Sequence, residues 1–281
     1  MIKCVDVLKK YDGFTLNCNF EIKPGLVTGL IGRNGAGKST TFKAILGLIH
    51  LDGGSIYYNG QLVDKNNPIN HDELGCVLTD AFFNGYLLVS DVKGILKRIY
   101  VNFDEMYFDN LLIKYSIPSK KKIKDLSTGM KATLKIAAAL SHHPKFLILD
   151  EPTNGLDVIA RDELLDMLRQ FMAEDEQHTI LISSHIFSDL ANICDEIIMM
   201  NYGQVSLEES LDELNDNYVS LKLSNEQYEA IDKSYIIARV ATNYGYHCIS
   251  NQGSYYRENY PSVVIEKASM DDVFTVLEKG E

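Results

Sequence analysis

A glycine-rich segment near the N-terminus constrains this chain more than any other feature. Residues Gly32–Ser39 read GRNGAGKS and match the pattern G-x-x-x-x-G-K-[ST] in full. The apolar run Leu26–Ile31 precedes the segment, and a pattern with one apolar helical face follows it from Lys38 to about Ile49. The sequence therefore predicts a buried strand, a phosphate-binding loop and a helix, in that order.

The residue types of this segment suit the phosphates of a nucleotide. Glycines let consecutive backbone N–H groups turn toward phosphate oxygens, and the N-terminus of the helix adds partial positive charge. Lys38 is placed to reach the β- and γ-phosphates, and Ser39 to ligate Mg²⁺. We predict that a nucleoside triphosphate and Mg²⁺ bind here through Gly32, Asn34, Gly35, Ala36, Gly37, Lys38, Ser39 and Thr40.

A second apolar run ends in two carboxylates. Phe146–Leu149 is followed by Asp150 and Glu151. Such a strand would deliver Asp150 to the Mg²⁺ shell, and it would leave Glu151 within reach of the attacking water as a general base. The loop and this pair together indicate a P-loop NTPase. GTPases, kinases and helicase-like motors stay open at this point, although no Asn-Lys-x-Asp motif supports GTP.

Three further motifs narrow the family. Leu126–Met130 reads LSTGM and opens an alanine-rich helix, Glu151–Asp157 reads EPTNGLD, and Ser183-Ser184-His185 ends the next predicted strand. With these motifs, residues 1–207 closely resemble the nucleotide-binding domains of ABC ATPases. The motifs occur in the order and at the spacing of that family.

The resemblance implies a dimer with ATP at its interface. Ser127, Thr128, Gly129 and Met130 stand where the family has its Leu-Ser-Gly-Gly-Gln signature. In the family, that signature meets the γ-phosphate of ATP bound to the opposite subunit. Thr128 and Met130 replace the usual Gly and Gln, whereas Ser127 and Gly129 keep the hydroxyl and the small residue.

The same resemblance implies roles for other positions. Asp157 would belong to a loop that crosses the dimer interface. His185 would touch the γ-phosphate and act in catalysis beside Glu151 and Lys38. Tyr11 lies near the place of an aromatic residue that stacks on adenine, although an aromatic residue that only ends a strand is also common.

The largest departure from the family is at its glutamine loop. A stretch like Leu-Gly-x-x-x-Gln is expected after the hairpin region, but the chain has Leu74, Gly75 and then Cys-Val-Leu before Thr79. Thr79, or Asp80 with a one-residue shift, occupies the glutamine position. Either side chain could offer an oxygen to Mg²⁺ or water, so both are candidates.

Composition limits the partners of the chain. Acidic residues outnumber basic ones by 39 to 27, which disfavours nucleic acid because phosphate binding needs a basic surface. The five cysteines are scattered without a CxxC pair, as in a reducing cytosol. No stretch approaches the roughly 18 apolar residues of a membrane helix, and no signal-peptide pattern begins the chain. We expect a cytoplasmic location, at the inner face of the cell membrane through a transmembrane partner.

The pattern along the chain predicts an α/β fold with a small C-terminal extension. Residues 1–207 should combine a RecA-like parallel sheet, an antiparallel β subdomain and a helical subdomain at about 84–145. Residues 208–281 contain two strand patterns and a final helix that a capping box at Ser269 begins. We read them as a small α/β accessory domain, and an equally good alternative is a passive cap over the core.

The sequence favours the ATP-hydrolysing subunit of a bacterial ABC exporter. The LSTGM variant and the C-terminal appendage resemble the ATPase subunits of bacterial ABC-2-type exporters. Transmembrane permease subunits and a second nucleotide-binding subunit, identical or different, are the implied partners. The alternative is a regulatory or ribosome-associated ATPase without a membrane partner. The sequence leaves the cargo open, and it does not fix the direction of transport.

Overall fold

A parallel sheet forms the centre of the molecule and carries the glycine-rich loop at its carboxyl edge. The computed structural model describes residues 1–79 and 83–280. In that part of the chain the strand order is β10-β9-β3-β8-β7-β6, with β10 antiparallel to β9 and the other pairs parallel. The strands are β3 (Val27–Ile31), β6 (Leu74–Val77), β7 (Phe146–Leu149), β8 (Thr179–Ser184), β9 (Glu196–Asn201) and β10 (Gln204–Ser210). Strands β3, β7 and β8 are buried along their whole length, as their continuous apolar runs require.

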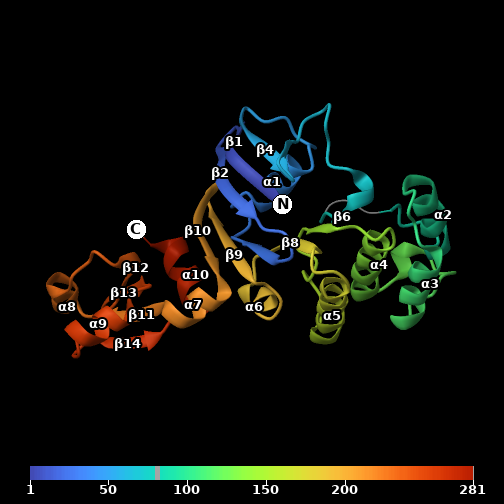
Figure 1. Ribbon diagram of the computed structural model, residues 1–281. Helices are drawn as coiled ribbons and strands as arrows, with labels where there is room; N and C mark the ends of the chain where they lie inside the picture. The colour runs from blue at the N-terminus through green and yellow to red at the C-terminus, as the bar shows by residue number, and fades with distance from the viewer. Residues whose placement is uncertain (80–82, 281) are drawn as a thin grey trace.

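An antiparallel sheet lies over one face of the central sheet (Figure 1). Its order is β2-β1-β4-β5, and its strands are β1 (Ile2–Tyr11), β2 (Phe14–Ile22), β4 (Gly53–Tyr58) and β5 (Gln61–Leu62). Alternate residues of β2 are buried, as in a strand with one face on a core. Helix α1 (Lys38–Ile45) packs between the two sheets, because its Phe42 and Ile45 share one hydrophobic core with Leu30 of β3 and Leu16 of β2.

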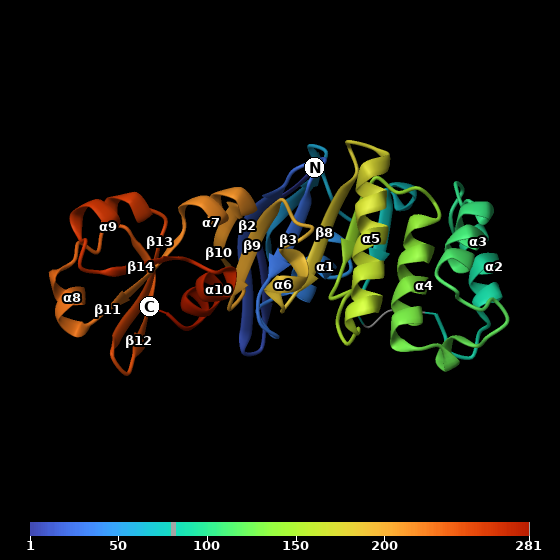
Figure 2. The same cartoon turned by 90° about the horizontal axis from the view of Figure 1, so that it is seen from below.

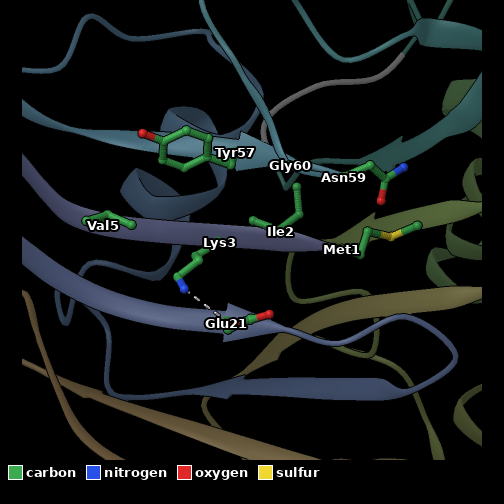
Figure 3. A pocket seen from close by; sticks show the side chains of 8 residues that line it. All are labelled: Met1, Ile2, Lys3, Val5, Glu21, Tyr57, Asn59 and Gly60. Atoms are coloured by element: carbon green, nitrogen blue, oxygen red, sulfur yellow. Dashed lines mark ion pairs between the residues drawn. The ribbon is translucent and has the colours of Figure 1, made fainter.

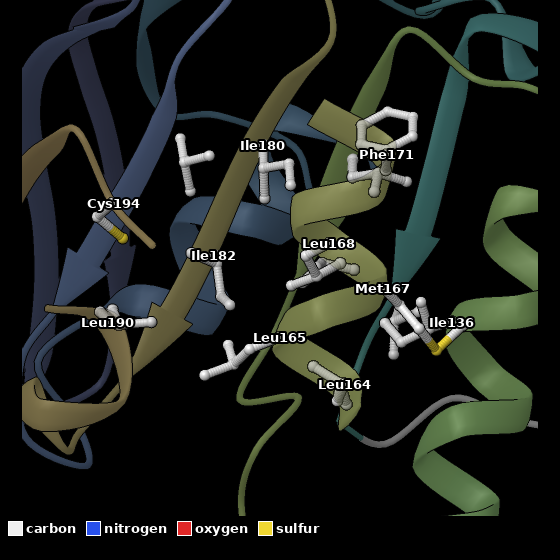
Figure 4. Packing of buried hydrophobic residues seen from close by; sticks show 14 of the residues in the cluster. Ile136, Leu164, Leu165, Met167, Leu168, Phe171, Ile180, Ile182, Leu190 and Cys194 are labelled. Atoms are coloured by element: carbon white, nitrogen blue, oxygen red, sulfur yellow. The ribbon is translucent and has the colours of Figure 1, made fainter. Parts of the chain in front are cut away.

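Helices cover the opposite face of the central sheet. Helix α5 (Val158–Glu174) turns Leu164, Leu165 and Leu168 toward β8, and Met167 toward Ile136 (Figure 4). The short helix α6 (Phe187–Leu190) covers the same face of the sheet, and in Figure 4 its Leu190 lies across β8 from α5. Along β8 the residues alternate between the two faces of the sheet, as a strand with two covered faces must.

The segment between β6 and β7 is largely helical and extends to one side of the molecule (Figures 1 and 2). Its helices are α2 (Val89–Ile99), α3 (Glu105–Lys114) and α4 (Thr128–Leu140), with a 3₁₀ turn at Ile123–Asp125; another 3₁₀ turn, His71–Glu73, precedes β6. Val92, Phe108 and Leu134 are fully buried and join the same core as α5. Helix α4 therefore connects this segment to the carboxylate-bearing strand β7.

The C-terminal residues form a second α/β unit at the opposite end of the molecule (Figure 2). The strand order of its sheet is β12-β13-β11-β14. Its elements are α7 (Leu211–Asn217), β11 (Val219–Leu223), α8 (Asn225–Ala230), β12 (Ile236–Thr242), β13 (Gly245–Ser250), α9 (Gly253–Asn259), β14 (Val264–Lys267) and α10 (Met270–Lys279). Ser269 and Asp272 form the predicted capping box of the last helix.

This unit is joined to the central sheet by shared packing. Val273 and Val276 of α10 are buried in the same hydrophobic core that contains Ile197 and Met199 of β9. Figures 1 and 2 both place α10 beside β9 and β10. The C-terminal unit therefore has a second core of its own, around Tyr256, and also contributes a helix to the main one. In the described parts of the chain, no helix has the length and apolar character needed to cross a bilayer.

A buried histidine joins the end of α4 to β6. His142 is 1% exposed, and its ring stacks on Tyr100 with centroids 3.8 Å apart. Its Nε2 lies 3.2 Å from the carbonyl oxygen of Leu74, and Nδ1 is buried without a hydrogen-bond partner among the described residues. Burial lowers the pKa of His142 to about 4, so the ring is neutral at physiological pH.

This pKa makes His142 a source of acid sensitivity. The unfolded chain binds a proton near the ordinary histidine pKa of 6.5, whereas the folded chain resists it down to about 4, so stability falls as pH falls through this window. Between about pH 7 and pH 5, His142→Phe should lose less melting temperature than the parent protein, by about 2–4 °C. Differential scanning fluorimetry at both pH values checks this, with the exposed His50→Phe as control. An equal loss in both variants would contradict it.

Candidate functional site

Two glycines of the loop between β3 and α1 have no room for a side chain or need a conformation that favours glycine. A Cβ on Gly32 would lie 2.5 Å from the carbonyl oxygen of Met200. Gly37 has φ +114°, a left-handed conformation that favours glycine, and a Cβ there would lie 3.2 Å from Cζ of Phe14. The carbonyl of Ala36 also accepts a hydrogen bond from Gly203 N at 2.9 Å, so the β9–β10 turn supports the loop.

Lys38 is the cation at the centre of the site. Its side chain is 5% exposed, and Nζ donates to the carbonyl oxygens of Gly32 at 2.6 Å and Arg33 at 3.2 Å. The same Nζ lies 3.1 Å from Oε1 of Glu151. The predicted phosphate-binding lysine and the predicted general base are therefore an ion pair. Phosphate oxygens that bind Lys38 would compete with Glu151 for one ammonium group.

Four oxygen-bearing side chains meet at the end of β7, because three hydroxyl groups contact the carboxylate of Asp150. Ser39 Oγ donates to Oδ2 of Asp150 at 2.9 Å, and Thr79 Oγ1 lies 3.1 Å from that same oxygen. Ser183 Oγ donates to Oδ1 of Asp150 at 2.7 Å, so both carboxylate oxygens are held. Ser39, Thr79 and Asp150 were all predicted as metal ligands. They form a set of hard oxygen donors of the kind that Mg²⁺ prefers.

Asp80, the other candidate for the glutamine position, lies outside the described residues. Thr79 is described, and its hydroxyl also lies 3.1 Å from the backbone carbonyl oxygen of Asp150. The side chain at position 79 therefore contacts the strand that carries both carboxylates.

Glu151 is held in an unusual conformation. Its φ is +50°, in the left-handed region, and its backbone N–H donates to Ser183 Oγ at 2.9 Å. His185 Nδ1 lies 2.6 Å from Oε2 of Glu151, and Lys38 contacts Oε1. Both carboxylate oxygens thus have a positively charged or ionisable partner, which fixes the direction of the side chain.

A pocket of about 430 Å³ opens beside the loop and the carboxylates. The described residues that line it are Phe14, Arg33, Asn34, Gly35, Gly37, Lys38, Ser39, Thr40, Thr79, Glu151 and Asn154. Gly32 and Ala36 belong to the same loop but do not line the pocket. Ala36 is 5% exposed, and its N–H donates to the carbonyl of Arg33 at 3.1 Å. Most of the predicted loop residues line one cavity together with Lys38 and Glu151, whereas His185 does not line it and contacts Glu151 instead.

The aromatic residue at this pocket is Phe14. Tyr11, predicted to stack on adenine, is 47% exposed and is not among the lining residues; its ring centroid lies 6.4 Å from that of Phe14. Both residues flank the Asp12-Gly13 turn between β1 and β2. Sequence reasoning considered the residue before this turn and missed the one after it.

The signature residues begin helix α4. Ser127 is its N-cap and accepts a hydrogen bond from Met130 N at 3.1 Å. Thr128 lines a second hollow, of about 320 Å³, together with Asp150 and Glu151. Gly129 packs closely on α5, because a Cβ there would lie 2.9 Å from Cβ of Ala160. Within one chain, the small residue at this position thus has a packing role.

Asp157 is the N-cap of α5 and accepts a hydrogen bond from Ala160 N at 2.9 Å. Ser127, Met130 and Asp157 line neither hollow within the described residues. All three belong to the group that was predicted to face a second subunit.

Two residues escaped sequence reasoning as parts of the site besides Phe14. Ser183 bonds to Asp150 and to the backbone of Glu151, and Asn154 lines the pocket. Ser183 stood in a recognised motif, and Asn154 lay inside the EPTNGLD segment. Only the pairing of β7 with β8 showed that the side chain of Ser183 reaches Asp150.

Another hollow, of about 540 Å³, lies on the antiparallel sheet (Figure 3). Lys3 and Glu21 form an ion pair across it at 3.8 Å, and Tyr57 and Asn59 lie on its far side. None of the site residues described above lines it. The candidate catalytic and nucleotide-binding residues described above therefore lie at the glycine-rich loop and not at this hollow.

Comparison with known proteins agrees with this geometry. The family described as "ABC transporter" matches residues 15–154. The ABC transporter ATP-binding protein YtrB of Bacillus subtilis is 31% identical over 80% of this chain and 77% of its own length. The bacitracin transport ATP-binding protein BcrA of Bacillus licheniformis is 34% identical over 80% and 76%, and the lantibiotic transport ATP-binding protein SrtF of Streptococcus pyogenes is 35% identical over 78% and 97%.

Solved structures show the same fold. The "ATP binding subunit of ABC transporter" has a TM-score of 0.66 at 26% identity, covering 76% of this chain and 92% of the other. The dimeric bacterial ABC transporter cassette MJ0796 has a TM-score of 0.66 at 25% identity, covering 75% and 99%. Both matches confirm the predicted α/β cassette fold.

The position of Phe14 generates a prediction about base stacking. A purine base held beside the loop would lie against Phe14, so Phe14→Ala should weaken MgADP binding roughly tenfold, the usual loss for one stacked base. Tyr11→Ala should have a smaller effect, because Tyr11 does not line the pocket. Isothermal titration calorimetry of both variants compares them directly. A larger loss in Tyr11→Ala would return the stacking role to the residue predicted from sequence.

Proposed function

This chain belongs to the ATP-binding proteins of ABC transporters, and on that basis we propose that it is the ATP-hydrolysing subunit of a bacterial exporter. The observation that carries the proposal is the contact of Lys38 with Glu151 in a pocket beside the phosphate loop, where Ser39 of the same pocket is hydrogen-bonded to Asp150. Two of the relatives are named as bacitracin and lantibiotic transport ATP-binding proteins, and these names favour an exporter. The comparisons do not favour the alternative of an ATPase without a membrane partner.

In the proposed reaction, water attacks the γ-phosphorus of ATP and the products are ADP and phosphate. Glu151 accepts the proton of the attacking water. Lys38 and the loop N–H groups bind the phosphate oxygens, and His185 holds Glu151 in position through Oε2. When phosphate oxygens bind Lys38 in place of Glu151, the carboxylate of Glu151 loses one of its partners. It then becomes a better proton acceptor.

The residues present also fit Mg²⁺. Ser39, Thr79 and Asp150 place hard oxygen atoms around one point, and Mg²⁺ there would neutralise charge on the phosphates. We assign the ion to these three side chains. Asp80, the further candidate from sequence, lies outside the described residues.

The proposed assembly has two ATP-binding subunits, identical or different, that close on two ATP molecules. Ser127–Met130 and Asp157 would face the partner subunit, a proposal that the exposure of Ser127, Thr128 and Asp157 at the starts of α4 and α5 supports. Separate transmembrane subunits would carry the cargo, and the chain would lie at the inner face of the membrane through them. ATP stabilises the closed dimer only through its higher affinity for that state.

Two variants separate nucleotide binding from hydrolysis. Glu151→Gln should keep MgATP binding, because Lys38 and the loop are unchanged, and should slow turnover at least about 100-fold because the base is lost. Lys38→Ala should lose MgATP binding itself. Phosphate release and calorimetry measure the two effects. Turnover near that of the parent protein in Glu151→Gln would remove Glu151 from the role of base.

The transporter assignment has its own test. A tagged native chain, isolated from its source cells in mild detergent, should co-purify with an integral membrane protein that mass spectrometry identifies. ATP hydrolysis by the isolated complex should then respond to the transported cargo. A chain that fractionates wholly without membrane proteins would support the regulatory alternative, even if its ATPase activity were normal.

A further inference from the structure

The last helix of the chain touches the phosphate loop. Arg33, the second residue of the loop, pairs with Glu278 of α10, with 3.0 Å between Nε and Oε1. Arg33 lines the nucleotide pocket, and its side chain is 70% exposed, whereas that of Glu278 is 13% exposed. A domain that no motif connects to ATP thus contacts the site at a charged group.

The position of Glu278 is set by packing. Helix α10 packs on β12 and β13, and its Val273 and Val276 are buried in the main hydrophobic core. The end of the helix fits closely as well, because a Cβ on Gly280 would lie 2.5 Å from the carbonyl oxygen of Arg239. Arg33 stands on the exposed side of the loop, so in this pair the carboxylate is the fixed member and the guanidinium the movable one.

The carboxylate depends on Arg33 for compensation of its charge. Oε1 of Glu278 is buried, and no donor among the described residues makes a hydrogen bond of good geometry to it. Among the described residues, Arg33 is the cation that forms an ion pair with it. Since a buried carboxylate without a counter-charge is costly, Glu278 draws the guanidinium toward α10.

The pair also removes a positive charge from the mouth of the pocket. A guanidinium beside a phosphate loop is well suited to bind phosphate oxygens, often through two parallel hydrogen bonds. While Arg33 is paired with Glu278, its charge is neutralised next to Lys38 and the loop N–H groups. Nucleotide phosphates and Glu278 therefore compete for Arg33.

We propose that Glu278 is a positioning residue for nucleotide binding: it holds Arg33 away from the phosphates, lowers nucleotide affinity, and so couples the C-terminal domain to the ATP site. The inference rests on the proposed function, because it requires nucleotide at the loop. A movement of α10 that withdrew Glu278 would leave Arg33 available to the phosphates and tighten binding.

Charge changes at the two positions test this coupling. Glu278→Gln frees the guanidinium and should tighten MgADP binding roughly two- to fivefold, the range for a partly exposed ion pair. Arg33→Ala leaves an unpaired carboxylate beside the loop and should weaken binding by a similar factor. In the double variant the two changes cancel, so its affinity should return toward that of the parent protein. Raising the salt concentration should shrink all three effects.

Asp271→Asn is the matched control. Asp271 is an exposed residue of the same helix, so this variant removes the same charge without touching the Arg33 pair. Calorimetric titration with MgADP of all four variants and the parent protein gives the dissociation constants. The control should bind MgADP like the parent protein.

The outcomes are distinct. Equal shifts in Glu278→Gln and Asp271→Asn, or a double variant that binds as weakly as Arg33→Ala, would overturn the inference. If Glu278→Gln does not fold, the opposite sign of Arg33→Ala and of Glu278→Asp, which keeps the charge on a shorter side chain and loosens the pair, still tests it. Failure of the parent protein itself to bind MgADP would contradict the proposed function instead.

Discussion

The site depends on a buried pair of opposite charges, Lys38 and Glu151. Each would be costly to bury alone, and each is stabilised only because the other lies 3.1 Å away with further hydrogen-bonding groups around both. Lys38 begins α1 after β3, Glu151 follows β7, and its partners Ser183 and His185 come from the end of β8 and the residue after it. The strand order β3-β8-β7 is therefore the arrangement that lets these charges meet.

The motifs made most of this site predictable. A full phosphate-loop match, an apolar strand ending in Asp150-Glu151, and a histidine after the next strand indicate which side chains meet, because carboxyl ends of parallel strands share one edge. Contacts with no local pattern escaped prediction. These are the position of Phe14 at the pocket, the hydrogen bond from Ser183 to Asp150, and the ion pair of Arg33 with Glu278. Each joins segments that only the packed fold brings together.

The C-terminal residues illustrate the same limit in a different way. Alternating apolar residues predicted strands there, and a capping box predicted the last helix. Neither pattern says which part of the molecule the apolar face of that helix packs against. In the structure, Val273 and Val276 complete the core beneath β9. The C-terminal unit therefore packs against the core that contains β9, as either an accessory domain or a passive cap over the core would.

The backbone of Glu151 has one more consequence. A residue other than glycine in the left-handed region costs on the order of 1 kcal/mol or more, and here φ is +50° at the residue that carries the carboxylate. Glycine would relieve that strain but would remove the carboxylate proposed as the base. Stability and the proposed chemistry thus favour different residues at position 151.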